Sequence, residues 1–283
     1  MRLQNAANHL SAALRRLAFL LCAGAVLALL QGCTALPGTG TGMLQRIDAL
    51  LPADIILIGE QHDAPGHQAL QRAAVTELAR RGNLAALAIE MAEQGHSTTG
   101  LPATATESQV RDALAWAEVG WPWDRYGPVV MAAVRAGVPV LGANLPRSAM
   151  RTAMGTESWD QRLAPQALEQ QRDDIRTGHC GLLPAAQIAP MARIQIARDA
   201  AMAATLAAGV QRGKTMLLIA GAGHVVRETG VPAHLPATLR TRVVLEVAGD
   251  AADTRQGLVD SVWRTVAVPP VDHCAGLQRR LSP

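Results

Sequence analysis

A short run of β-branched and aliphatic residues, Ile55–Ile58, constrains the fold more than any other feature of the chain. An uninterrupted apolar run of this length is typical of a strand buried on both faces. It stops at Gly59, and four polar residues, Glu60–Asp63, follow. Asp63 and Pro65 are suited to the N-cap and first turn of a helix. The body and end of that helix are indicated by Leu70, Ala74, Leu78 and Gly82.

This strand–turn–helix arrangement recurs along the chain. We expect further strands at Leu84–Glu90, Val138–Asn144, Met216–Ala220, Val243–Val247 and Val262–Val268, with an edge position open for the last. We expect helices capped near Thr106, over Pro128–Ala136 and Ala164–Arg176, and from Pro190 to about Ala208, with the rest of residues 145–189 irregular. Alternating strands and helices predict a single α/β domain with a largely parallel central sheet and helices on both faces.

The first 32 residues have the pattern of an export signal. Two arginines, Arg15 and Arg16, precede an apolar segment, Leu17–Leu30, that is too short to span a bilayer with ease. The sequence Leu-Gln-Gly-Cys that ends at Cys33 resembles a bacterial lipobox, which predicts cleavage before a lipid-modified Cys33. An uncleaved membrane anchor is the alternative. Residues 33–45 are then expected to form a lipidated flexible tether, followed by an α/β domain over residues 46–283.

These features place the protein in the bacterial cell envelope. Thr34 follows the cysteine where inner-membrane retention is associated with aspartate, so we expect an outer-membrane anchor with the domain facing the periplasm. The formal charge falls from +3 to zero on cleavage, because the leader holds three arginines and no acidic residue. We find no basic run interleaved with aromatic residues, so a nucleic-acid partner is not expected.

The cysteines point to one disulfide. Cys22 leaves with the leader and Cys33 carries lipid, which leaves Cys180 and Cys274 in an oxidising compartment. A bond across these 94 residues could stabilise the fold by about 4 kcal/mol. Each cysteine follows a histidine, so a Cys/His metal site is an alternative, although the spacing matches no zinc module.

Four predicted strands end in polar side chains, which should meet at one edge of a parallel sheet. These are Glu60 with His62, Glu90, Asn144 and His224. Both histidines lie in turns of the form Gly-x-x-His. Two imidazoles and two carboxylates would suit a divalent metal or acid–base chemistry. The alternative is ordinary loop polarity, because surface loops and helix caps are rich in such residues.

Four of the seven aromatic residues are close together, at Trp116, Trp121, Trp123 and Tyr126. They could anchor a helix to the core, as aromatic residues commonly do. They could also form an apolar wall for a flat ligand, with the only tyrosine of the chain available as a phenolate ligand to ferric haem. The sequence leaves both interpretations open.

The motifs in their order along the chain resemble one known family, the ChaN-like haem-binding lipoproteins of the Tiki and erythromycin-esterase-like superfamily. The resemblance is carried by Ile58-Gly-Glu-Gln-His62, Trp123-x-x-Tyr126-x-Pro128, the segment Val138–Arg147, Gln195-x-x-x-Asp199-x-x-Met202-Ala203, and Gly221-Ala-Gly-His-Val225 with Gly230-Val-Pro232.

The resemblance implies a lipid-anchored periplasmic protein that binds haem and takes part in haem or iron uptake, with a possible haem-linked homodimer. A ligand-binding protein is thus expected rather than an enzyme. Tyr126 would be the axial ligand, and Arg125, Arg147, His62 or His224 would meet the propionates, beside Asn144. The alternative is a metal-dependent hydrolase, in which His62 and His224 hold a divalent ion and Glu60 or Glu90 activates its water.

Overall fold

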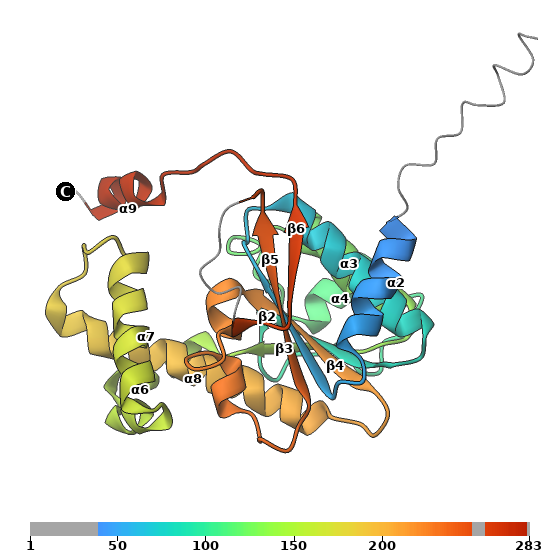
Figure 1. Ribbon diagram of the computed structural model, residues 1–283, viewed down its shortest axis with the longest axis horizontal. Coiled ribbons are helices and arrows are strands. Elements are labelled where there is room, and N and C mark those ends of the chain that lie inside the picture. Colours follow the sequence, from blue (N-terminus) through green and yellow to red (C-terminus); the bar gives the residue numbers. More distant parts are fainter. Residues whose placement is uncertain (1–38, 251–257, 282–283) are drawn as a thin grey trace, which may run out of the picture. The chain divides into compact units, whose positions relative to one another are not determined.

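Six parallel strands form one sheet in the order β3-β2-β4-β1-β5-β6 (Figure 1). The computed structural model describes residues 39–250 and 258–281, so the predicted signal peptide and Cys33 lie outside the described residues. The strands are β1 Ile55–Glu60, β2 Leu84–Glu93, β3 Val140–Asn144, β4 Thr215–Gly221, β5 Thr241–Ala248 and β6 Ser261–Thr265. The prediction of an α/β domain with a parallel sheet is confirmed, and the last strand lies at an edge.

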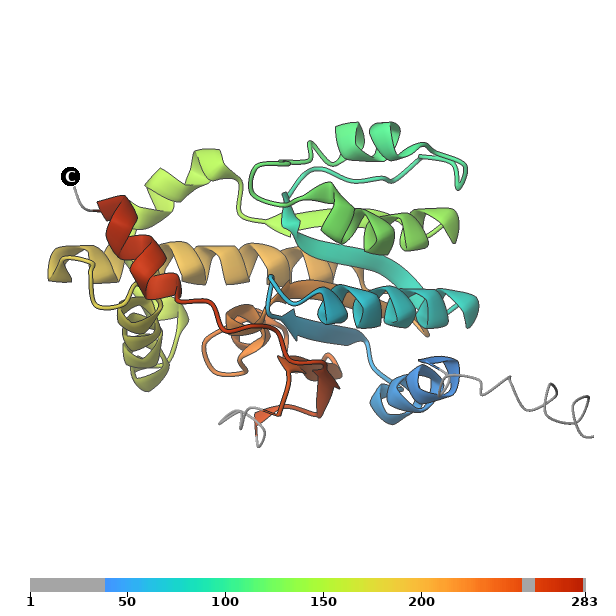
Figure 2. The same ribbon diagram turned by 90° about the horizontal axis from the view of Figure 1, so that it is seen from above.

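Helices occupy most of the segments between the strands (Figure 2). They are α2 Thr39–Leu50, α3 Pro65–Arg80, α4 Glu107–Ala113, α5 Trp123–Arg135, α6 Arg147–Gly155, α7 Pro165–Gly178, α8 Ala185–Gly209 and α9 His273–Leu281, with the 3-10 turns η1 Glu157–Arg162, η2 Ala222–Val225 and η3 Val231–His234. None of these helices is long and apolar enough to cross a membrane.

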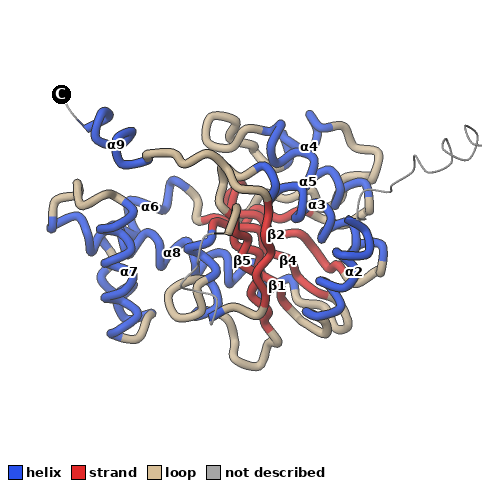
Figure 3. The backbone as a smooth tube through the Cα atoms, turned by 45° about the horizontal axis from the view of Figure 1, so that its top comes forward, coloured by secondary structure: helices blue, strands red, loops and turns tan. Residues whose placement is uncertain are grey.

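The sheet is covered on both faces, as the apolar strands predict (Figure 3). Side chains alternate along β1, so that Ile56 and Ile58 face a core formed with α2, α3 and α5. Ile55 and Leu57 face the opposite core, formed mainly with α8 and the turns after β4. Because β1 lies between β4 and β5, its carboxyl end is at the centre of the sheet, next to that of β4.

The structure corrects three predicted segments: the tether over residues 33–45 and the starts of two helices. The expected tether over residues 33–45 is wrong from Thr39 on, because α2 begins there and buries Met43, Ile47 and Leu50 at helical spacing. Helix α5 begins at Trp123 rather than Pro128. Helix α8 begins at Ala185 and contains Pro190, since a proline near the start of a long helix removes only one of its many hydrogen bonds.

Local predictions at the turns have mixed outcomes. Thr106 is the N-cap of α4, where it forms a reciprocal capping box with Gln109. Asp63, in contrast, does not cap α3: the N-cap is Ala64, and the Asp63 carboxylate accepts a hydrogen bond from Gln61 instead. The helix expected over Ala164–Arg176 is present as α7, but most of the rest of residues 145–189, expected to be irregular, is also helical. Helix α6 in particular packs on α8, an interaction that its own sequence does not reveal.

Candidate functional site

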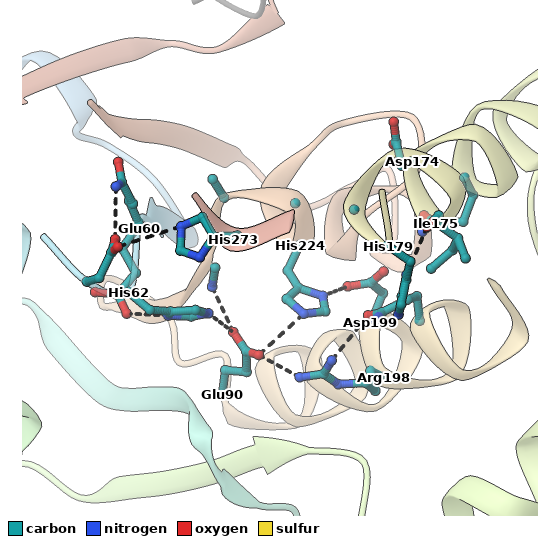
Figure 4. A pocket seen from close by; sticks show the side chains of 18 of the residues that line it. Glu60, His62, Glu90, Asp174, Ile175, His179, Arg198, Asp199, His224 and His273 are labelled. Carbon is teal, nitrogen blue, oxygen red and sulfur yellow. Dashed lines mark hydrogen bonds and ion pairs between the residues drawn. The ribbon is translucent and has the colours of Figure 1, made fainter. Parts of the chain in front are cut away.

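A cavity of about 600 Å³ lies at the carboxyl ends of β1, β2 and β4 (Figure 4). Its walls come from the turns after β1 and β4, from α7 and α8, and from the first residue of α9. The register places Glu60 beside Gly221, so the two Gly-x-x-His turns are neighbours in space. A Cβ atom at Gly221 would lie 2.9 Å from the Nε2 atom of His62, so a side chain at this position would have to displace the imidazole.

Glu90 is the centre of the site. His62 Nε2 lies 3.9 Å from one carboxylate oxygen and His224 Nε2 lies 3.4 Å from the other. The backbone amide of Gly221 donates a hydrogen bond of 2.7 Å to the first oxygen, and the Arg198 guanidinium donates one of 2.5 Å to the second. The expected meeting of the two histidines and Glu90 is therefore confirmed.

The charges around Glu90 control its protonation. Its side chain is only 3% exposed, and burial alone would raise the pKa of this carboxyl group. His224, Arg198 and His62 outweigh that effect and lower the pKa well below its usual range. Asn144 supports this arrangement from behind, because it accepts a hydrogen bond from Arg198 and donates one to the backbone carbonyl of Glu90. Glu90 is thus a buried carboxylate anion.

His224 is held between two carboxylates. Its Nδ1 atom lies 2.6 Å from an oxygen of Asp199 on α8, and its Nε2 atom faces Glu90. Burial alone would lower the pKa of His224, but the negative charges of Asp199 and Glu90 raise it to about 10. His224 is therefore an imidazolium cation at neutral pH. Together with Arg198 it neutralises the two buried acids.

Glu60 forms a second, adjoining cluster. Its oxygens accept hydrogen bonds from Gln68, from Gln71 and from the hydroxyl group of Tyr126, and one oxygen lies 2.7 Å from the Nδ1 atom of His62. Burial alone would lower the pKa of His62, but Glu60 and Glu90 raise it above its ordinary value. The side chain of His62 is 40% exposed and faces the cavity.

The aromatic residues anchor α4 and α5 and do not form a ligand wall. Trp123 and Tyr126 are buried in the core, with Trp116 packed against both. Two of the group contact cavity residues: Tyr126 through its hydrogen bond to Glu60, and Trp121 by placing its ring edge-on to His62 with 4.9 Å between centroids. None of the four side chains lines the cavity. The anchoring interpretation is therefore the one that the geometry supports.

The predicted disulfide between Cys180 and Cys274 is present, with 5.7 Å between the Cα atoms. It joins the residue after the C-cap of α7 to α9, and the two helices lie at the same end of the domain (Figures 1 and 2). Because the sulfur atoms are bonded to each other, the alternative Cys/His metal site is excluded. The histidines that precede the two cysteines, His179 and His273, both line the cavity.

The alternative of a divalent-metal site is not supported. Within the part of the chain that the structure describes, no group of three or more His, Cys, Asp or Glu side chains could hold a metal ion. Both oxygens of Glu90 are occupied by donors, and Arg198 already supplies the positive charge. The neighbouring carboxylates raise the pKa of both His62 and His224, which favours the protonated rings over the free ring nitrogen that a metal needs.

Comparison with known proteins decides the family. The family model described as "Haem-binding uptake, Tiki superfamily, ChaN" matches residues 46–235. This range includes every residue that lines the cavity except His273. The chain belongs to this ChaN family.

The fold of this ChaN-family protein is also that of a solved structure. "Cofacial heme binding to ChaN of Campylobacter jejuni" is similar with a TM-score of 0.60 and 24% sequence identity, covering 76% of this chain and 88% of that chain. "The structure of the type III effector HopBA1" covers the same shares with a TM-score of 0.42 and 16% identity. No curated protein matches the chain.

Of the residues expected to bind haem in this ChaN-family protein, some line the cavity and others do not. Arg125, His62 and His224 line the cavity, and Arg125 donates a 2.6 Å hydrogen bond to the backbone carbonyl of His62. Arg147 does not line it: its side chain is 70% exposed and lies 3.8 Å from Glu93. Asn144 is buried behind Arg198.

Tyr126 is poorly placed to be an iron ligand. The residue is 3% exposed, does not line the cavity, and donates its hydroxyl hydrogen to Glu60 at 2.7 Å. Burial and the negative charge of Glu60 raise the pKa of the phenol, which disfavours the phenolate that iron would need. Its role in this geometry is to satisfy a buried carboxylate.

Several site residues do not lie at the end of a strand, which is the signal that marks the others in the sequence. Asp199 stands in a motif shared with the family, but neither it nor Arg198 follows a strand. The partner of Arg198, Glu90, lies 108 residues away. Beyond the family motif that contains Asp199, the local signal for both residues is their place as polar side chains among the apolar residues of Ile196–Ala203. His179 and His273 follow no strand either, and their proximity to the site depends on the disulfide.

Proposed function

We propose that this protein binds haem in the cavity at the strand ends and takes part in haem or iron uptake. Membership of the haem-binding uptake family supports the ligand class. The observation that supports this binding location is the cavity of about 600 Å³, because its size suits a ligand of this class.

The lining of the cavity fits haem. An axial ligand of haem iron is commonly an imidazole, and the cavity wall contains His179 and His273 besides the two histidines that are paired with Glu60, Glu90 and Asp199. The propionates need a cation or hydrogen-bond donors, and Arg125 supplies a guanidinium at the wall. Ile175 and Ala222 give apolar surface for the ring, and Gly178 and Gly223 face open space. Haem would be cargo here, so the residues of the chain bind and orient it without a reaction.

The proposal predicts a saturable shift of the Soret band when ferric haem is added to the domain. Gly178→Trp should weaken binding by about tenfold or more, because Gly178 lines the cavity and faces open space. Gly155→Trp is the matched control, since Gly155 also ends a helix with open space around it but lies outside the cavity. No Soret shift at micromolar haem would refute haem binding, and equal binding by both variants would refute this location.

The same titration tests the expected homodimer. The similar Campylobacter structure is described as binding haem cofacially, and two facing haems are brought together most simply by two copies of a chain. We therefore infer that haem binding is accompanied by dimer formation. Sedimentation velocity should show the sedimentation coefficient rise with haem; a monomer at saturation would count against the dimer.

We propose also that Cys33 carries a lipid that anchors the protein to the outer membrane. The domain would then face the periplasm. The support is the lipobox-like sequence ending at Cys33 and the apolar segment before it. Mass spectrometry of membrane-extracted protein should find an N-terminal Cys33 peptide with added acyl mass, and Cys33→Ser should release the domain from the membrane fraction. An unmodified Cys33 in mature protein would exclude the anchor.

A further inference from the structure

The last part of the chain, from β6 to α9, forms one side of the cavity although it lies outside the family match. That match ends at residue 235, and β6, the connecting residues 266–272 and α9 follow it. We call residues 266–272 the strap. The strap contains neither helix nor strand, and it runs from the edge strand β6 to α9 (Figures 1 and 2). This chain therefore adds to the cavity a wall that the family match does not include.

The first two residues of α9, His273 and Cys274, form a bridge between two walls of the cavity. Cys274 is bonded to Cys180, which follows the C-cap of α7. His273 lines the cavity, and its Nε2 atom lies 3.8 Å from a carboxylate oxygen of Asp63 in the turn after β1 (Figure 4). Asp63 lines the cavity as well. The bridge thus connects the end of α7 with the turn after β1 across one side of the cavity.

The disulfide is the strongest of the contacts that hold the bridge. The side chains of His273 and Asp63 are 73% and 35% exposed, so solvent weakens the attraction between them. Within the described chain, the hydrogen bonds of the strap are local, to Thr265 or to the first turn of α9. Two of its apolar side chains, Val266 and Val271, are exposed, so the strap gains little stability from burial.

The same bond decides how far the strap can move. Residues 266–273 alone separate the end of β6 from Cys274. A segment this short that is attached at both ends has little freedom to leave the cavity. When the disulfide is broken, the chain after Thr265 is attached at one end only, and the conformational entropy of the freed residues favours its release.

We propose that the Cys180–Cys274 bond is a site of reversible reduction and that its reduction opens the cavity for ligand exchange. This inference rests on the proposed haem binding. The oxidised form keeps the bridge in place and slows the entry and exit of haem. The reduced form releases the bridge together with the strap, so that haem enters and leaves through the side of the cavity that they occupied.

The reductant belongs to the class of dithiols. One of its thiolates attacks the sulfur of Cys274, which lies in an exposed residue, and Cys180 leaves as a thiolate that takes up a proton. The second thiol of the reductant then attacks the mixed disulfide and releases Cys274. Two electrons and two protons thus pass to the protein, which gains two thiols, and the dithiol becomes a disulfide.

Hydrogen–deuterium exchange tests the opening without haem. Oxidised protein is compared with protein treated with dithiothreitol and with the double variant Cys180→Ser, Cys274→Ser. The backbone amides of α9 should exchange about tenfold faster in the treated protein and in the variant, whereas those of α3 should keep their rates. Equal rates for α9 in all three samples would show that the bond does not hold the bridge, and would overturn the inference.

Stopped-flow measurement of haem exchange tests the consequence. The rate of haem uptake and the rate of haem transfer to an excess of apoglobin should both rise about tenfold in the double variant. The Kd for haem should change by less than about threefold, because an opened entrance affects entry and exit alike. A variant that had only lost stability would bind haem more weakly without faster uptake. Dithiothreitol should have no further effect on the double variant, which excludes an action of the reductant on haem itself.

The outcomes separate this inference from the proposed function. If neither redox form binds haem, the proposed function fails, whereas faster amide exchange in α9 would still support release of the bridge by reduction. If both forms take up and release haem at the same rates, haem binding stands and the bridge does not control exchange. Thiol titration completes the test: a disulfide that dithiothreitol leaves intact in the folded protein would overturn the assignment of a reduction site.

Discussion

Replacement of Arg198 by methionine is expected to lower the free energy of unfolding by about 3 to 5 kcal/mol. Arg198 donates a 2.5 Å hydrogen bond to Glu90, whose side chain is 3% exposed. Methionine has a similar volume but no charge, so the buried carboxylate keeps the Gly221 amide and the two histidines, His224 and the more distant His62, as partners. The loss of Arg198 also leaves the amide oxygen of Asn144 without its donor.

Urea unfolding of wild-type protein, Arg198→Met, Glu90→Gln and the double variant measures this effect. The double variant should be less destabilised than the sum of the single variants, because Glu90→Gln removes the charge that Arg198→Met leaves unpaired. Arg111→Met is the matched control: its partner Glu118 is half exposed, and the loss should stay below about 1 kcal/mol. A loss for Arg198→Met no larger than for Arg111→Met would show that Glu90 does not depend on Arg198.

Stability is expected to fall between pH 6.5 and pH 9 by on the order of 3 kcal/mol because of His224. The pKa of His224 is raised from 6.5 to about 10 in the folded protein. A raised pKa means that the folded state holds the proton more tightly than the unfolded state. The stabilisation is therefore complete below pH 6.5 and is lost as pH rises toward 10. Glu90 acts in the opposite direction, since its lowered pKa contributes stability that is lost as pH falls below about 4.5.

Urea unfolding at a series of pH values tests the alkaline loss. His224→Gln should be less stable than wild-type protein at pH 6.5, because Asp199 and Glu90 lose their cationic partner. Its stability should nevertheless change much less between pH 6.5 and 9, apart from a smaller contribution of the same sign from His62. Equal slopes for the two proteins would mean that His224 is neutral in the folded state.

Much of the fold could be predicted from local sequence patterns. Continuous apolar runs predict the strand cores, because parallel strands are buried on both faces, and Ile55–Ile58 is fully buried as expected. Helix boundaries differ from the prediction where local helix propensity favours one start and burial favours another. Pro190 suggests a helix start, yet α8 already runs from Ala185 because Ile188 and Ala192 gain burial against neighbouring helices.

The sequence by itself determined which polar groups end the strands and which cysteines pair, because both follow from neighbouring residues and simple elimination. Glu60, His62, Glu90 and His224 meet for that reason. Only the tertiary structure decided what each group does there. Arg198 and Asp199 reach Glu90 and His224 from a helix distant in sequence, while Tyr126 is withdrawn into the core. The physical reason is that protonation and availability of a ligand atom depend on charges and burial contributed by remote segments, which no local pattern records.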